Sequence, residues 1–157
     1  MIPNLDFQHD RVSLEVDGHK KTVLLNEQGN LNAGSQCKSL HIQRPIGEKL
    51  GDLSVLDDHQ SSFRRFFWVN NVPKYGLRGQ HAHKECVETI VSISGKVDLL
   101  LIDRTGHMDF LTLGSSAIVL PPRVWIVLRF HSVTSCVLVG CSHYYEPDDY
   151  IFDFSEL

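Results

Sequence analysis

Two histidines separated by one residue, His81 and His83, form the pattern with the clearest chemical meaning in this sequence. Side chains two positions apart in an extended strand point to the same face, and the carboxylate of Glu88 follows on a nearby segment. An imidazole titrates at about pH 6.5, so such a pair can exchange protons around neutrality. Two histidines and a carboxylate are also a ligand set for non-haem iron. The residues alone allow proton transfer, metal binding, or an exposed pair on an edge strand.

Short apolar runs bounded by Gly, Pro, Asp or Ser recur along the chain and predict short strands. We therefore expect strands to position these side chains. Alternating runs on both sides of Asp17-Gly18 predict a β-hairpin over residues 11–25. The absence of a ten-residue helical period favours an all-β sandwich or barrel. Further strands are predicted over residues 39–43, 53–56, 63–69, 87–94, 96–102, 110–113, 117–120, 125–130 and 136–141.

Two aromatic stretches carry expectations of their own. The run over residues 63–69 predicts a strand packed on both faces, because three aromatic side chains follow one another at Phe66, Phe67 and Trp68. The acidic and aromatic end of the chain, residues 144–157, predicts a short helix or turn.

Length and composition limit the class of protein. A chain of 157 residues supports one domain that hides roughly 70% of its unfolded surface. Fifteen Lys and Arg against nineteen Asp and Glu give a net charge of -4, which argues against nucleic-acid binding. No apolar run approaches about eighteen residues and no leader pattern opens the chain, so we expect no membrane segment and a cytoplasmic location. The widely spaced Cys37, Cys86, Cys136 and Cys141 predict free, buried thiols.

The spacing around the histidines resembles the first sequence motif of the cupin superfamily. After His81-Ala82-His83 come four residues, Glu88, six more residues and Gly95. The second cupin motif is incomplete, because Gly114 and Pro121-Pro122 occupy its first positions but Ile126 stands where a histidine is usual.

A closer resemblance covers residues 39–155 and points to the cupin sugar 3,4-ketoisomerases. It is carried by Arg78–Lys84, Pro122–Trp125 and Ser142–Ile151, with Gly51-Asp52-Leu53 and Arg65 also in place. These enzymes act on dTDP-4-keto-6-deoxyglucose in the synthesis of deoxysugars for bacterial surface glycans, such as the O-antigen of lipopolysaccharide.

The resemblance implies a cupin jelly-roll β-barrel over residues 39–157. Residues 1–38 lie outside the resemblance, and their predicted hairpin makes them an N-terminal hairpin extension. The resemblance also implies a homodimer that converts a dTDP-linked 4-keto sugar into its 3-keto isomer through an enediol, with no metal or cofactor. A ketone at C4 acidifies the hydrogen on C3, so a histidine is a suitable base for this reaction. By resemblance, His81 and His83 handle the proton, and the residues do not divide the roles of acid and base between them.

Five further side chains are candidates for binding the substrate. The guanidinium groups of Arg65 and Arg78 suit an anionic partner such as a pyrophosphate or enediolate. Trp125 offers an aromatic face for a sugar, and Glu88 lies next to the histidines. Tyr75 is a possible replacement phenol, because the related enzymes have tyrosines where this chain has Phe67 and Trp68.

The differences between this sequence and the related enzymes leave two alternative functions open. The related enzymes tend to have glutamine at the position of Glu88, so His81, His83 and Glu88 could instead serve a metal-dependent cupin. The missing tyrosine and Ile126 also allow a module that binds a nucleotide sugar without converting it.

Overall fold

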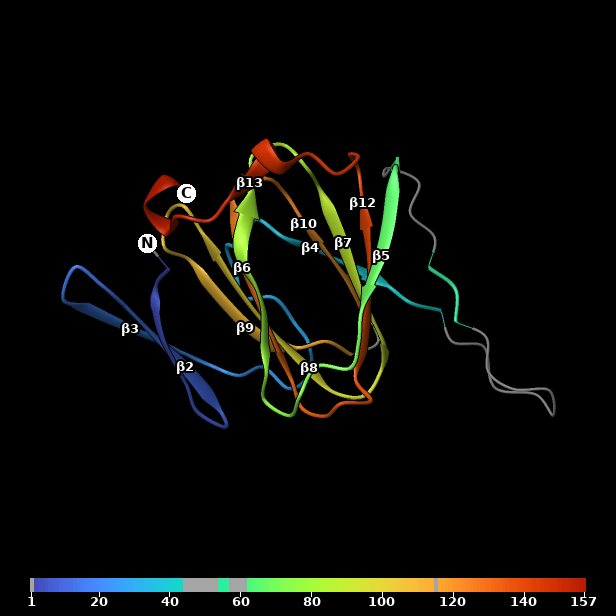
Figure 1. Ribbon diagram of the computed structural model, residues 1–157. Helices are drawn as coiled ribbons and strands as arrows, with labels where there is room; N and C mark the ends of the chain where they lie inside the picture. The colour runs from blue at the N-terminus through green and yellow to red at the C-terminus, as the bar shows by residue number, and fades with distance from the viewer. Residues whose placement is uncertain (1, 44–53, 57–61, 115) are drawn as a thin grey trace.

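The structure is a computed structural model that describes residues 2–43, 54–56, 62–114 and 116–157. Two antiparallel sheets of five strands face each other in it (Figure 1). The first sheet has the order β4 (Lys38–His41), β10 (Ser116–Leu120), β7 (Glu88–Ser94), β12 (Cys136–Cys141) and β5 (Arg65–Val69). The second has the order β13 (Tyr150–Ile151), β6 (Leu77–His83), β11 (Val124–Phe130), β8 (Val97–Asp103) and β9 (Met108–Thr112). The predicted all-β class is confirmed.

The predicted strand positions agree with the structure within one or two residues in most cases. The run over residues 53–56 is described only from residue 54, and Val55 forms a single bridge with Gln43. Gly51-Asp52-Leu53 lies outside the described residues. The chain ends with two 3-10 turns, η1 (Pro147–Asp149) and η2 (Phe154–Glu156), as the C-terminal pattern predicts. Among the described residues, no helix is long and apolar enough to cross a bilayer.

The N-terminal segment forms a separate sheet of three strands, β1 (Asn4–Phe7), β2 (Arg11–Val16) and β3 (His19–Leu24). The predicted hairpin is confirmed as β2 and β3, which meet at Asp17 and Gly18 with φ values of 51° and 75°. Positive φ at both central residues is the geometry of a type I′ turn, which matches the twist of the flanking strands. The added strand β1 extends the hairpin into the sheet seen on the left of Figure 1.

Alternating side chains of β11 divide the interior into two apolar layers. Val124, Ile126 and Leu128 belong to the core between the two five-stranded sheets. Trp125 and Val127 point the other way, into a second core that includes residues of the N-terminal sheet. All seven positions of β8 and of β11 are buried, because these central strands are covered on both faces.

The predicted burial of both faces of β5 is wrong for the single chain. The side chains of Phe66 and Trp68 are 56% and 66% exposed on the outer face of their sheet. Phe67 and Val69 alternate with them and pack against the core between the sheets. The sequence could not predict this exposure. A run of aromatic residues has the same pattern whether its second face packs against a core or lies on the surface.

Candidate functional site

The inward position of the two histidines on β6 depends on a β-bulge. His81 pairs with Ile126 of the inner core, but the register then slips at Gln80, which is left unpaired beside Gly79. Gly79 and Gln80 have φ values of 84° and 60°, a local kink that an extra residue produces. His81 and His83 therefore share the inner face that their spacing predicts, with ring centroids 5.2 Å apart.

His83 is held by a carboxylate at one ring nitrogen and is unpartnered at the other. Its Nδ1 lies 2.7 Å from Oδ2 of Asp149, whose Oδ1 accepts the backbone N–H of Glu85. Its Nε2 lies 3.3 Å from Oε1 of Glu88, but the direction does not make a hydrogen bond, so this buried nitrogen has no hydrogen-bonding partner among the described residues. Such an atom is suited to meet a polar atom of a ligand.

The two histidines experience opposite electrostatic environments. Burial lowers the pKa of His81, and the backbone of Gly79 and the charge of Glu88 oppose this only in part. Burial also acts to lower the pKa of His83, but the carboxylates of Glu88 and Asp149 outweigh it, so that the net shift is upward. Neutral His81 beside a more readily protonated His83 is an arrangement for a base and an acid.

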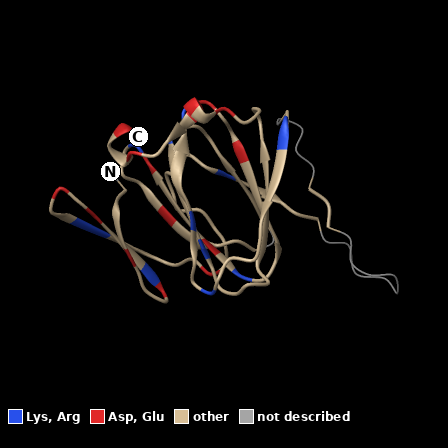
Figure 2. Cartoon of the chain, in the orientation of Figure 1, with Lys and Arg blue, Asp and Glu red and all other residues tan. Residues whose placement is uncertain are grey.

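The opposite sheet contributes Arg65 and Glu88 through one row of paired residues. Cys141 of β12 pairs with Arg65 of β5 on one side and with Glu88 of β7 on the other. Figure 2 shows the basic start of β5 and the acidic start of β7 at the same end of the barrel, below the acidic turn η1. Nη2 of Arg65 lies 3.4 Å from Sγ of Cys141, and within the described part of the chain Arg65 has no carboxylate partner. This guanidinium is available to an anion.

The structure adds Tyr150 and Asp149, which the sequence did not single out. Tyr150 pairs with His83 across β13 and β6, so its ring lies on the same inner face. The ring centroid of Tyr150 is 5.0 Å from that of His81 and 4.4 Å from that of His83. The pairing joins Tyr150 to a segment almost seventy positions earlier in the chain, so no local pattern could reveal it. Asp149 and Tyr150 do lie in the C-terminal segment that carries the family resemblance.

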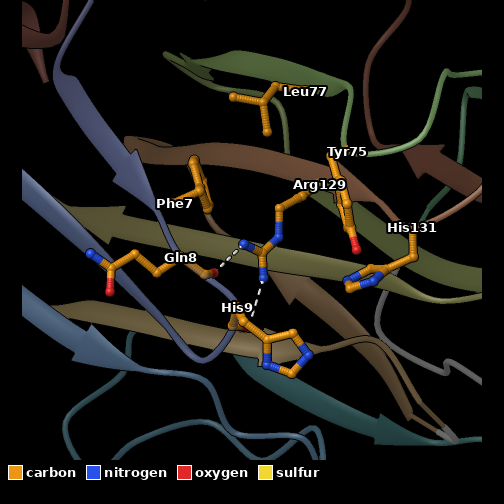
Figure 3. Close-up of a pocket in the computed structure, with 7 residues that line it drawn as sticks. All are labelled: Phe7, Gln8, His9, Tyr75, Leu77, Arg129 and His131. Atoms are coloured by element: carbon orange, nitrogen blue, oxygen red, sulfur yellow. Dashed lines mark hydrogen bonds between the residues drawn. The ribbon is translucent and has the colours of Figure 1, made fainter.

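Tyr75 and Trp125 do not join this cluster. Tyr75 is 55% exposed and lines a pocket of about 360 Å³ on the outer side of the barrel, with Phe7, Gln8, His9, Leu77, Arg129 and His131 (Figure 3). Trp125 is fully buried in the second core, edge-on to Phe154 at 5.3 Å. A sugar bound near the histidines therefore meets neither side chain in this structure. Arg78 shares the inner face with the histidines, because it pairs with Leu128 of the inner core, and it is exposed.

The histidine cluster has donor atoms that could hold a metal ion. One atom each of His81, His83 and Glu88 lies within 4.8 Å of the other two, and His83, Cys86 and Asp149 form a second such group. The first group is the set predicted from spacing. Its imidazole and carboxylate donors suit a divalent transition metal, with Asp149 orienting His83 from the other side.

Comparison with known proteins places most of the chain in one family. A family model described as "FdtA: WxcM-like, C-terminal" matches residues 35–157. The TDP-4-oxo-6-deoxy-alpha-D-glucose-3,4-oxoisomerase of Aneurinibacillus thermoaerophilus is 27% identical over 113 residues, which cover 69% of this chain and 81% of that protein. The first 34 residues lie outside the family match.

Solved structures agree with the fold. The sugar 3,4-ketoisomerase QdtA of Thermoanaerobacterium thermosaccharolyticum, crystallised with TDP, has a TM-score of 0.70 at 22% identity and covers 76% of this chain and 90% of its own. The TDP-quinovose 3,4-ketoisomerase WlaRB of Campylobacter jejuni has a TM-score of 0.69 at 23% identity, covering 77% and 95%. The predicted cupin barrel is confirmed by these matches.

Proposed function

Because the chain belongs to the FdtA family of WxcM-like C-terminal domains, we propose that it is a sugar 3,4-ketoisomerase acting on a TDP-linked 4-keto-6-deoxy sugar. The observation that carries this proposal is the histidine pair itself. One imidazole is kept neutral by burial, and the other lies beside two carboxylates while its Nε2 has no hydrogen-bonding partner in the described part of the chain. The 27% identical oxoisomerase supports the choice of substrate.

The reaction moves one proton between carbons. His81 removes the hydrogen of C3, which the neighbouring C4 carbonyl acidifies, and the C3 electrons form a double bond to C4 as the carbonyl oxygen becomes an enediolate. Protonated His83 stabilises the negative oxygen through its Nε2–H, because Asp149 holds the ring in place at Nδ1. His81 then returns the proton to C4, and the carbonyl forms at C3 once the hydroxyl proton of O3 has passed to O4.

We assign partners for the charged groups of the substrate to both five-stranded sheets. Arg65 lacks a carboxylate partner among the described residues and faces the histidines from the opposite sheet, so we assign it to an oxygen of the sugar or pyrophosphate. Arg78 is exposed on the inner face of β6 and is assigned to the pyrophosphate. Glu88 is buried and is assigned to keeping the charge of His83.

Incubation with dTDP-4-keto-6-deoxyglucose in heavy water tests the proposal and separates its alternatives. We expect a 3-keto product with deuterium at C4, and deuterium at C3 in recovered 4-keto substrate, at a rate that dialysis against a chelator leaves unchanged. A rate lost on chelation and restored by iron or manganese would identify a metal-dependent cupin, a function that the clustered donors of His81, His83 and Glu88 favour. A rise in melting temperature with TDP, without any exchange, would identify a binding module.

Replacing Asp149 tests how His83 is controlled. In Asp149→Asn the carboxylate that raises the pKa of His83 is removed, so the alkaline limb of the kcat/KM profile should move to lower pH. We expect kcat to fall about 10- to 100-fold near neutral pH, an effect typical of residues that orient a functional histidine. The exposed Asp148→Asn is the matched control. An unchanged alkaline limb in Asp149→Asn would exclude this role.

We further propose that the protein is a homodimer that uses the outer face of the β5 sheet. Phe66, Trp68 and Ile93 are each more than half exposed there, and Trp68 pairs with Leu138, which pairs with Val91. An apolar surface across three strands of a sheet is typical of an interface, and a second copy would cover the aromatic residues symmetrically.

Light scattering after size exclusion tests the dimer. The double variant Trp68→Glu with Ile93→Glu should elute as a monomer, because two charges cannot be buried unpaired at an interface. Val133→Glu is the control, since Val133 is 54% exposed outside this sheet face. A monomeric wild type, or a double variant that remains dimeric, would exclude this face.

The remaining assignments concern location and organisation. We propose a cytoplasmic protein, which the free thiols of Cys37, Cys86, Cys136 and Cys141 support. We also propose residues 1–38 as an extension and residues 39–157 as the cupin domain, a division supported by a family match that begins at residue 35.

A further inference from the structure

Moving the carbonyl from C4 to C3 requires two separate proton transfers. One proton leaves C3 and arrives at C4, which is the step assigned to His81. A second proton must leave the hydroxyl on C3 and arrive at the oxygen on C4, so that the C4 ketone becomes an alcohol as the C3 alcohol becomes a ketone. The second transfer needs a group that can give and take a proton at oxygen.

We propose that the hydroxyl of Tyr150 carries this second proton, an inference that rests on the proposed isomerase function. The phenol gives its proton to O4 as the enediol forms and takes the proton of O3 as the new carbonyl forms. The tyrosine is regenerated in each turnover, and no oxidant, reductant or metal is consumed.

The position of Tyr150 supports this role. Its ring contacts both His81 and His83, and its pairing with His83 turns it to the inner face of β6. Of the four tyrosines, Tyr75 lies in the pocket on the outer side of the barrel, and Tyr144 and Tyr145 are 68% and 60% exposed. Tyr150 is half-buried and is the tyrosine in ring contact with the histidine pair.

Arg65 provides the charge that a transient phenolate needs. Its Nη2 lies 3.5 Å from the hydroxyl oxygen of Tyr150. Its Nε is buried without a hydrogen-bonding partner, so the guanidinium is not saturated by the described residues. A nearby cation stabilises negative charge that develops on the phenol during transfer. Tyr150 thus replaces the phenol that β5 lacks, where Phe67 packs beside the same guanidinium at 5.3 Å.

The variant Tyr150→Phe tests the assignment, with Tyr144→Phe as the control. In heavy water, wild-type protein and the control should form product at equal rates. Tyr150→Phe should form product at least about 100-fold more slowly, because acid–base groups contribute factors of this size. His81 can still remove and return the C3 proton, so the ratio of deuterium exchange at C3 to product formed should rise. This ratio does not depend on the fraction of folded protein.

A second variant makes the test specific for the phenol. Adding Phe67→Tyr to Tyr150→Phe places a hydroxyl on a ring that already lies beside Arg65, and part of the lost rate should return. If the wild type makes product and Tyr150→Phe matches it in rate and exchange ratio, the assignment to Tyr150 is overturned while the isomerase function stands. If the wild type makes no product, the isomerase function falls, and the assignment falls with it.

Discussion

His81→Asn should lower kcat by about 10²- to 10⁴-fold, the range expected for loss of a positioned general base. Asparagine keeps a polar side chain of similar reach but cannot accept a proton near neutral pH. Deuterium exchange at C3 should disappear together with product formation, because both begin with removal of the same hydrogen. This joint loss distinguishes His81 from Tyr150, whose replacement should preserve exchange.

The pH profile gives the same assignment an independent check. Since burial lowers the pKa of His81, the acid limb of wild-type kcat/KM should lie below about pH 6.5, where the base becomes protonated. TDP should raise the melting temperature of wild type and His81→Asn equally, and His19→Asn, on an exposed strand of the N-terminal sheet, is the control. Exchange at C3 that survives in His81→Asn would assign the base elsewhere.

Asp98→Ala should destabilise the fold by about 3–5 kcal/mol, the cost of leaving a buried charge unpaired. Asp98 is fully buried, and its Oδ2 accepts hydrogen bonds from Nη2 of Arg129 at 2.7 Å and from Nε2 of His131 at 2.6 Å. Arg129 is itself only 5% exposed, so solvent screens its charge poorly once the carboxylate is lost. Urea denaturation should show a lower midpoint, and the exposed Asp10→Ala should leave it essentially unchanged.

Removing both charges should recover much of this loss. In Asp98→Leu with Arg129→Met, the cation is removed together with its carboxylate, so the double variant should be more stable than Asp98→Ala, although it also loses the hydrogen bonds from Arg129 to the carbonyls of Gln8 and His9. A double variant that is less stable would contradict the explanation from an unpaired charge.

The carboxylate of Asp98 also makes the free energy of unfolding depend on pH. Burial raises the pKa of Asp98, but hydrogen bonds from His131, Arg129 and Thr112 lower it overall. Because the folded-state value lies below the unfolded value of about 3.9, this stabilisation is complete above that value. It is lost as the pH falls through the folded-state pKa.

Much of the fold was predictable because turn residues and alternating runs are local signals. The Asp17-Gly18 hairpin and the strands from β7 to β12 appeared where the sequence placed them. The histidine pair was also local, since a two-residue spacing fixes a shared face within one strand.

The rest of the site depends on contacts between distant segments. Arg78 lies three residues before His81, so simple alternation would place the two side chains on opposite faces of β6. The bulge at Gln80 brings both side chains to the same face. Tyr150 and Asp149 reach His83 through pairing of β13 and through η1, which no local pattern encodes. Tyr75 shows the reverse case, because closeness in sequence to the histidines did not bring it to their side of the barrel.

Arg129 attaches the N-terminal sheet through the main chain. Its Nη1 and Nη2 donate to the backbone carbonyls of Gln8 and His9, and its guanidinium lies over the ring of Phe7. Carbonyl groups are present whatever the side chains are, so residues 8 and 9 are free to change without detaching the sheet. The rim of the outer pocket in Figure 3 can therefore diverge in sequence while the barrel beneath it, and the chemistry inside it, stays constant.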